Sequence, residues 1–435
     1  MKRDKRFLTV KVLNIFDKSN KKLQLVRNQI LINCNSNIKS HVIASTNDIT
    51  RLRGRLDLLI SKISNKKIDQ INIKLINILR LGFYEILYCK KIPKYATVSS
   101  LVNLAKSTEN KKASGFINFI LRKLISETKK RGPFESYKKF SDWNSFPQWI
   151  QKRWKKNFGK NNCLRLMNYF NTKQGLYVRI NSNIGYEKVL GSLDSEDLSF
   201  EIFSQNFIRL DKGIKKLLKS NLFKHGLISI QDPAAGAVVN LLDLKEGDTV
   251  LDVCAAPGTK SIFISEIIGC KGKVYSYDNN EQRIKTAKSD LSRNDLNNII
   301  WGQKDAKTDI YPISKKILVD VPCTGTGVIG KKPDIKWRRN PRDINEMSEL
   351  QLKILQNMSK FLEIGGIMIY STCSIEKEEN WDVVELFLKY NVNFKLVKIT
   401  NFQYPEWIDS NGCLMTIPYK HKVSGIFAAK LNKYA

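Results

Sequence analysis

The sequence predicts a multidomain protein with an all-α N-terminal domain, a small α+β middle domain and an α/β C-terminal domain. Its 435 residues exceed the roughly 100–200 residues of a typical single domain. Helical periodicity dominates the first part of the chain, whereas β-branched runs alternate with helical stretches after about residue 226. We therefore expect domains at residues 1–140, 141–225 and 226–435.

Apolar spacing predicts the helices of the first domain. Residues 97–105 carry apolar side chains at positions i, i+3, i+4 and i+7, with Thr97 as a candidate N-cap, and residues 116–124 repeat this spacing. Residues 73–88 are apolar on nearly every side, as expected for a central helix that its neighbours bury. Strand patterns are scarce here, which favours an all-α domain.

The middle of the chain mixes the two periodicities. Residues 131–150 are rich in Gly, Pro, Ser and Asn, which indicates a linker. Residues 176–180 have the pattern of a strand, and residues 186–193 that of a short helix. A small α+β domain follows from this mixture, but the pattern indicates no function for it.

The last domain alternates short strands with helices. This alternation predicts right-handed βαβ crossovers and a parallel sheet. The expected strands lie at residues 249–254, 273–278, 299–302, 316–321 and 366–371.

The formal net charge of +33 favours a polyanionic partner, because each lysine or arginine placed on a phosphate releases condensed counterions. Heavy use of Lys, Ile and Asn throughout the chain is an alternative source of this charge. We expect nucleic-acid binding.

Other classes of protein are disfavoured. The basic start of the chain is followed by neither a long apolar run nor a small-residue cleavage site, so no signal peptide is expected. No uninterrupted apolar run reaches about 18 residues, so no membrane span is expected. The eight cysteines form no C-x-x-C pair, which argues against a metal site and favours a reduced, cytoplasmic protein.

The loop after the first strand of the last domain is a candidate ligand site, since ligands of such sheets bind at the carboxyl ends of the strands. Small residues there let a ligand approach the backbone, and the next helix offers free amides. Positions 254 and 259 lack the glycines of a phosphate-binding P-loop, and no G-x-G-x-x-G fingerprint is present. The loop consists of Cys254, Ala255, Ala256, Pro257, Gly258, Thr259 and Lys260.

Polar residues follow the other strands of this domain. Asp278 ends the second strand, where it can accept hydrogen bonds from a ribose, and Asp305 follows the third, near a possible adenine edge. An aspartate there is commonly a turn residue, but two in register favour a site. Cys323 and Cys373 follow the fourth and fifth strands, so two thiols are expected beside the ligand loop.

These motifs resemble those of the RNA cytosine-C5 methyltransferases. The similar segments are Leu251–Gly258, Asp320–Cys323 with Thr326–Ile329, Pro333–Trp337, and Ser371–Ser374 with Glu378–Asn380. The helical front, including Ser114–Asn118, is similar to a NusB-like RNA-binding domain. Together they are similar to the ribosomal RNA enzymes of this family.

The resemblance implies a Rossmann-like methyltransferase domain that holds S-adenosylmethionine between the 254–260 loop, Asp278, Asp305 and Asp320. It implies methylation of 16S ribosomal RNA of the small subunit by a monomer. It assigns attack on cytosine carbon 6 to Cys373 and release to Cys323, while Asp320 contacts the base; the residues alone leave the two cysteines' roles open. Thiolate addition turns carbon 5 into a nucleophile, and Lys260 is a candidate for favouring the thiolate.

Two departures from the family pattern are Thr259, in place of a second glycine, and Ser424, in place of an aspartate. The basic segment 331–342 around Trp337 is expected to contact phosphates and to stack on a base.

Two alternative functions stay open: a transfer RNA methyltransferase, and a non-catalytic RNA-binding assembly or antitermination factor. The two cysteines and the complete ligand loop disfavour the latter.

Overall fold

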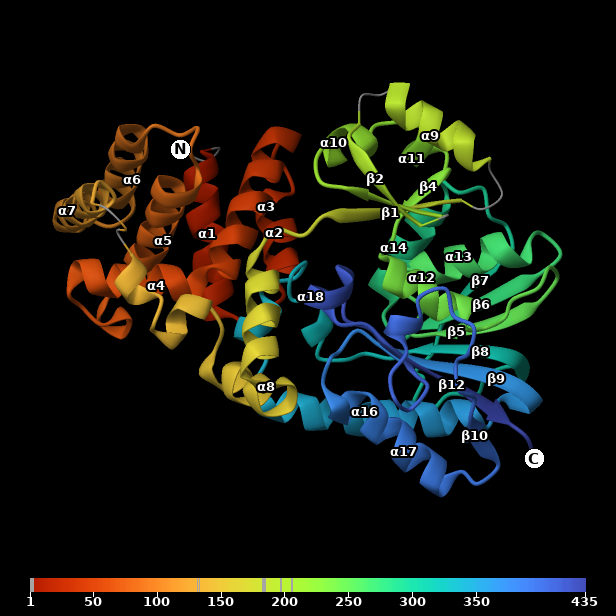
Figure 1. Cartoon of the computed structure of the whole chain (residues 1–435). Helices are drawn as coiled ribbons and strands as arrows, with labels where there is room; N and C mark the ends of the chain where they lie inside the picture. The colour runs from red at the N-terminus through yellow and green to blue at the C-terminus, as the bar shows by residue number, and fades with distance from the viewer. Residues whose placement is uncertain (1–3, 131, 133, 182–184, 196–197, 205) are drawn as a thin grey trace. The chain divides into compact units, whose positions relative to one another are not determined.

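A computed structural model describes residues 4–435 apart from 131, 133, 182–184, 196–197 and 205. The chain forms two compact units (Figure 1). The helical unit comprises residues 1–173 and 329–339, and the sheet unit comprises residues 174–328 and 340–435. The expected domain limits at 140/141 and 225/226 do not coincide with these limits and stay a prediction.

The helical unit is built around α5 (Ile73–Tyr88), which packs against α1, α3, α4, α6 and α7. The prediction of a central buried helix is confirmed. Its other helices are α1 (Lys5–Lys18), α2 (Leu23–Leu31), α3 (Ser36–Arg51), α4 (Arg53–Ser64), α6 (Lys94–Thr108), α7 (Lys111–Glu127), α8 (Gln148–Asn171) and α15 (Ile335–Arg338), with short 3-10 helices η1 (Ile68–Gln70), η2 (Glu135–Tyr137) and η3 (Ser141–Asn144).

Two local predictions for this unit need correction. Thr97 is not an N-cap: α6 begins three residues earlier, at Lys94, and the Thr97 hydroxyl donates to Glu85 at 2.7 Å. The linker expected at 131–150 contains η2, η3 and the start of α8. Residues 131 and 133 of that linker, and residues 1–3 of the basic start, lie outside the described residues.

A small antiparallel sheet begins the sheet unit. The expected strand at 176–180 is β1 (Leu176–Ile180), and the expected helix is α9 (Tyr186–Ser195). The strand order is β2-β3-β1-β4. The remaining elements of this part are β2 (Phe200–Ser204), β3 (Phe207–Leu210), β4 (Ile228–Ile230), α10 (Ile214–Leu217) and α11 (Asn221–Lys224).

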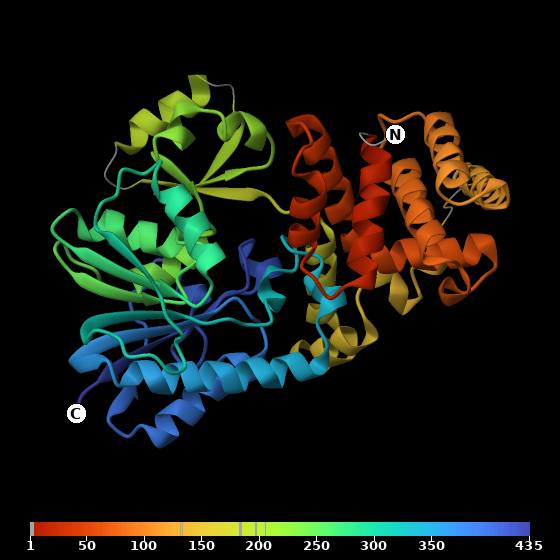
Figure 2. The same ribbon diagram turned by 180° about the vertical axis from the view of Figure 1, so that it is seen from behind.

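The large sheet has the order β10-β12-β9-β8-β5-β6-β7, with β11 paired to β12. Helices α12, α13 and α14 cover one face and α16 and α17 cover the other, which gives three layers (Figures 1 and 2). The elements are α12 (Pro233–Asn240), β5 (Thr249–Val253), α13 (Thr259–Ile268), β6 (Lys273–Asp278), α14 (Glu281–Leu291), β7 (Ile299–Gln303), β8 (Ser314–Asp320), η4 (Thr326–Val328), α16 (Pro341–Ser359), β9 (Leu362–Thr372), η5 (Lys377–Glu379), α17 (Trp381–Tyr390), β10 (Phe394–Leu396), η6 (Pro405–Trp407), β11 (Leu414–Met415), α18 (Pro418–His421) and β12 (Phe427–Lys433).

All five expected strands of this domain are present as β5 to β9, and they pair in parallel. The sheet is nevertheless mixed, because β12 pairs antiparallel with β9. The β12 sequence contains two alanines and three polar residues, so β-branched enrichment did not reveal it. Among the described residues, every helix is too short or too polar to cross a membrane.

Candidate active site

The ligand loop leaves the buried strand β5 and turns sharply into α13. Cys254 adopts a positive φ of 61°, and Gly258 adopts a φ of 96° at the N-cap position of α13. A Cβ on Gly258 would lie 3.0 Å from the Trp301 ring, so both backbone conformation and space favour glycine there. The structure thus places residues 254–260 at the carboxyl end of β5, as the sequence predicts.

Asp278 lies beside this loop and is only 2% exposed. Its carboxylate accepts hydrogen bonds from the backbone amides of Ala256 at 3.2 Å and Asn280 at 3.0 Å. Arg283 pairs with it at 2.9 Å and also donates to the carbonyl oxygen of Ala256. A carboxylate has about four acceptor positions, so Asp278 organises the loop and still has acceptor capacity for a ligand.

Asp305 has a different environment, with a side chain 37% exposed. Its carboxylate accepts from the backbone amide of Lys307 at 3.0 Å, and its own amide donates to Asp309 at 2.9 Å. These contacts are those of an aspartate that closes a turn. Its role toward an adenine stays a prediction.

Asp320 ends β8 and faces the ligand loop. The Lys260 amine lies 2.6 Å from its carboxylate, and the Ser371 hydroxyl donates to the other oxygen at 2.7 Å. Burial lowers the pKa of the Lys260 amine, but the carboxylates of Asp320 and Asp252 more than offset this, so its pKa is raised. Lys260 therefore carries a positive charge, and it interacts electrostatically with Cys373.

The two cysteines meet at the ends of β8 and β9. Their sulfur atoms lie 3.1 Å apart, although 50 residues separate them in the chain. Both are partly exposed, whereas Thr324 and Ser374, which follow them, are 2% and 0% exposed. The structure therefore brings together the two thiols that the sequence singles out, in residues that are partly exposed.

The cysteines of this region differ in acidity. The hydrogen bond with Cys373, followed by burial, raises the pKa of Cys323 well above its usual value. Burial, followed by the charges of Asp278, Asp320 and Asp252, also raises the pKa of Cys254. Cys254 and Cys323 are therefore thiols at neutral pH, and Cys254 is unsuited to nucleophilic attack.

Two residues of this site were not singled out from the sequence. Asp252 in β5 is fully buried, and burial raises its pKa to about 7. One carboxylate oxygen accepts a hydrogen bond from the Ser261 hydroxyl at 2.6 Å, and the other oxygen has no hydrogen-bond partner in the described part of the chain. The sequence signal that could have identified Asp252 is an acidic residue inside an otherwise apolar strand. The second residue is Glu379, whose buried carboxylate joins both cysteine loops.

In the basic segment, the structure contradicts the predicted phosphate contact of Lys336, and the other contacts stay a prediction. Lys336 is 0% exposed, so it cannot contact a phosphate in this conformation. The indole N–H of Trp337 donates to the Thr50 carbonyl at 2.7 Å, and Arg338 pairs with Asp334 at 2.8 Å. Segment 329–339 packs within the helical unit because these contacts lie there. Only Lys331, Lys332 and Arg342 of its predicted phosphate contacts are exposed.

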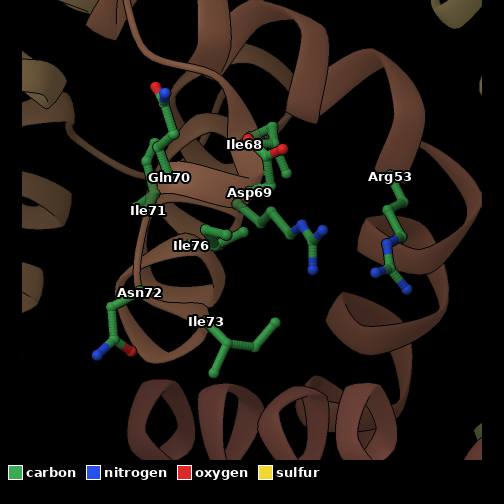
Figure 3. Close-up of a pocket in the computed structure, with 9 residues that line it drawn as sticks. Arg53, Ile68, Asp69, Gln70, Ile71, Asn72, Ile73 and Ile76 are labelled. Carbon is green, nitrogen blue, oxygen red and sulfur yellow. The ribbon is translucent and has the colours of Figure 1, made fainter.

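A pocket of the helical unit lies along α4, η1 and the start of α5 (Figure 3). It contains no predicted site residue. Its two arginines, Arg53 and Arg80, both pair with Asp17, at 3.0 and 2.7 Å. Arg80 also pairs with Asp57, so the charges of the pocket wall are balanced locally.

The comparisons with known proteins agree with this architecture. A family model described as 16S rRNA methyltransferase RsmB/F matches residues 239–432, and the NusB family matches residues 3–126. The ribosomal RNA small subunit methyltransferase B of Serratia proteamaculans is 31% identical, over 82% of this chain and 81% of that protein. Its Yersinia enterocolitica counterpart is 30% identical, over the same shares. The solved structure of PH0851 covers 99% of both chains with a TM-score of 0.79 and 24% identity.

Fold and site define an S-adenosylmethionine-dependent methyltransferase with a Rossmann-like catalytic domain and a NusB-like helical front. More narrowly, the chain belongs to the ribosomal RNA small subunit methyltransferase B family. The resemblance and the fold class expected from the sequence are thereby confirmed.

Proposed function

We propose that this protein methylates carbon 5 of a cytosine in 16S ribosomal RNA through a covalent cysteine–cytosine intermediate. The observation that carries the proposal is the pair of sulfur atoms, 3.1 Å apart at adjacent strand ends, from two partly exposed cysteines. A methyltransferase that only positions its substrate needs no such pair. The family relationship supports ribosomal RNA of the small subunit as the substrate, and the net charge of +33 suits it.

Cys373 is the attacking group in this proposal. Its neighbour Lys260 is positively charged, which favours a thiolate on Cys373. The thiolate adds to carbon 6 of the cytosine, and carbon 5 becomes nucleophilic enough to accept a methyl group. Asp320, at the same sheet edge, contacts the base where charge develops. The carbon-5 proton is then lost to a base, the bond between carbon 6 and the Cys373 sulfur breaks with the sulfur leaving as a thiolate, and the Cys323 thiol assists this release.

The residues around the ligand loop fit S-adenosylmethionine. Asp252, Asp278 and Asp320 all act electrostatically on Cys254, so the loop has acidic surroundings. This environment suits a ligand that carries a sulfonium and an ammonium group. Asp278 would hold the ribose and Asp305 the adenine edge, while residues 254–260 approach the ligand through their backbone. When bound, S-adenosylmethionine supplies the methyl group.

The cysteine pair provides the decisive experiment. Cys373→Ala and Cys323→Ala are incubated with RNA and S-adenosylmethionine and run on a denaturing gel. Cys323→Ala should transfer the methyl group and then stall as a nuclease-sensitive protein–RNA band, because elimination is not assisted. Cys373→Ala should form no band and no 5-methylcytosine.

The opposite pattern would exchange the roles of the two cysteines. Absence of a band in both variants, with reduced stability only, would reject the covalent mechanism. Mapping 5-methylcytosine across total RNA with and without the gene separates ribosomal from transfer RNA as substrate. A cytoplasmic monomer is the state we expect.

A further inference from the structure

The carboxylate of Glu379 occupies a central position behind the two cysteines. Glu379 ends η5, six residues after Cys373, and is 0% exposed. Its two oxygens accept hydrogen bonds from four donors, which belong to three residues in two loops and one helix. Buried carboxylates are costly unless such donors surround them, so this arrangement requires an explanation beyond packing.

The donors connect the carboxylate to both cysteine loops. The Thr324 amide donates to it at 2.7 Å, and the Thr324 hydroxyl donates to its other oxygen. The Ser374 hydroxyl donates at 2.6 Å. Thr324 directly follows Cys323 and Ser374 directly follows Cys373. One carboxylate thus holds the residue after each cysteine.

A third element strengthens this connection. The Gln351 amide group on α16 donates to Glu379 at 3.0 Å and to the Pro322 carbonyl at 3.0 Å, so the residue before Cys323 is also held. The Tyr370 hydroxyl lies 3.2 Å from the Gln351 side-chain oxygen. Burial raises the pKa of Glu379, and its hydrogen bonds to Ser374 and Thr324 oppose this effect.

We propose that Glu379 is a positioning residue that fixes the Cys323 loop against the Cys373 loop, so that release can follow attack. This inference rests on the proposed covalent function. No hydrogen bond between Glu379 and either sulfur is described; its hydrogen bonds reach the two cysteine loops through Thr324 and Ser374, and its charge also contributes to the raised pKa of Cys323. Displacing a reacting group by about 1 Å can reduce a rate on the order of 100-fold.

The test compares Glu379→Ala with Glu379→Gln in the full-length protein. The alanine variant lacks the two oxygens that accept hydrogen bonds from both cysteine loops. Glutamine keeps the geometry, because its oxygen can accept from the two N–H donors while its amide donates to the two hydroxyls, which can rotate. Thr324→Val removes one hydroxyl contact on the Cys323 side and serves as a milder variant if Glu379→Ala does not fold.

We expect Glu379→Ala to bind S-adenosylmethionine within about twofold of the wild type, while turnover falls on the order of 100-fold. The covalent protein–RNA band should accumulate, because release is impaired more than attack. Glu379→Gln should recover most of the turnover. Thr324→Val should show a smaller change in the same direction. Glu266→Gln, which alters a buried carboxylate paired with Arg179 in the same unit, should leave the ratio of band to product unchanged.

Wild-type turnover in Glu379→Ala would overturn the proposal. Parallel loss of S-adenosylmethionine binding and turnover in Glu379→Ala would also overturn it, since that result indicates a purely structural role. A Glu379→Gln variant as slow as Glu379→Ala would overturn the proposal as well, because the loss of turnover would then be caused by the lost charge of Glu379. Failure of the proposed function is distinct: the wild type itself would then produce no 5-methylcytosine.

Discussion

Lys260 in the sheet unit is largely buried and Lys336 in the helical unit is fully buried, but the surroundings of the two lysines differ. The Lys260 amine lies 2.6 Å from the Asp320 carboxylate, and its pKa is raised. The Lys336 amine donates to the Arg51 carbonyl at 2.7 Å and to the Asn171 side chain at 3.0 Å. Burial, followed by the charges of Arg51 and Arg55, lowers the pKa of Lys336 well below its usual value.

The difference shows that burial alone does not tell what a lysine does. A carboxylate partner keeps Lys260 charged near Cys373, where the charge would favour the thiolate of the proposed reaction. Among the described residues, the hydrogen-bond acceptors of Lys336 are neutral, and its amine lies 4.1 Å from the centre of the Phe146 ring, so it acts as a hydrogen-bond donor inside the helical unit. We therefore assign Lys260 to the proposed reaction and Lys336 to packing within the helical unit.

Replacing Lys260 should produce the largest effect. Lys260→Met removes the positive charge beside Cys373 and leaves Asp320 without its ion-pair partner. Turnover should fall about 100- to 1000-fold, as when one electrostatic group of an active site is removed. Single-turnover methyl transfer measures this, with the exposed Lys273→Met as the control. If turnover stays within about threefold of the wild type, the charge on Lys260 plays no part in the reaction, and the contrast with Lys336 loses its functional meaning.

The neighbouring Asp252 predicts a pH dependence of stability. Burial raises its pKa from 3.8 to about 7, so the folded protein keeps a proton that the unfolded chain releases above about pH 4. The free energy of unfolding should therefore fall as the pH rises from about 4 to 7, by up to about 4 kcal/mol, and level off above. Asp252→Asn should lack this slope. Urea unfolding across this range compares them, with the exposed Asp295→Asn as the control; parallel curves for wild type and Asp252→Asn would contradict the raised pKa.

Replacing Lys336 should produce the smallest effect. The pH dependence of stability that it causes should have the opposite sign to that of Asp252. Because its pKa is lowered in the folded state, the unfolded chain binds an extra proton below the usual lysine pKa of 10.5. Wild-type stability relative to Lys336→Met should increase as the pH rises toward about 10, and the change at neutral pH should be about 1 kcal/mol. Methyl transfer by the folded variant should be little changed. Lys331→Met, in the same segment but exposed, is the control. A stability difference that shrinks as the pH rises would mean that Lys336 is charged when buried.

Local pattern predicted most of the large sheet. The five strands β5 to β9 were expected within a few residues because β-branched runs bounded by turns are a local signal. The antiparallel strand β12 was missed, since its alanines and lysines carry no such signal and its place depends on pairing with β9. Thr97 was mistaken for an N-cap for a similar reason: its partner, Glu85, lies on another helix.

The sequence by itself determined the order of the elements, the family and the position of both cysteines at strand ends, because these depend on residues close together in the chain. Only the tertiary structure decided that the two sulfur atoms lie 3.1 Å apart, that Glu379 joins their loops and that Lys336 is buried. Lys336 and its partner Asn171 are 165 residues apart in the chain. Burial and charge state are set by which distant residues surround a group, and no local pattern carries that information.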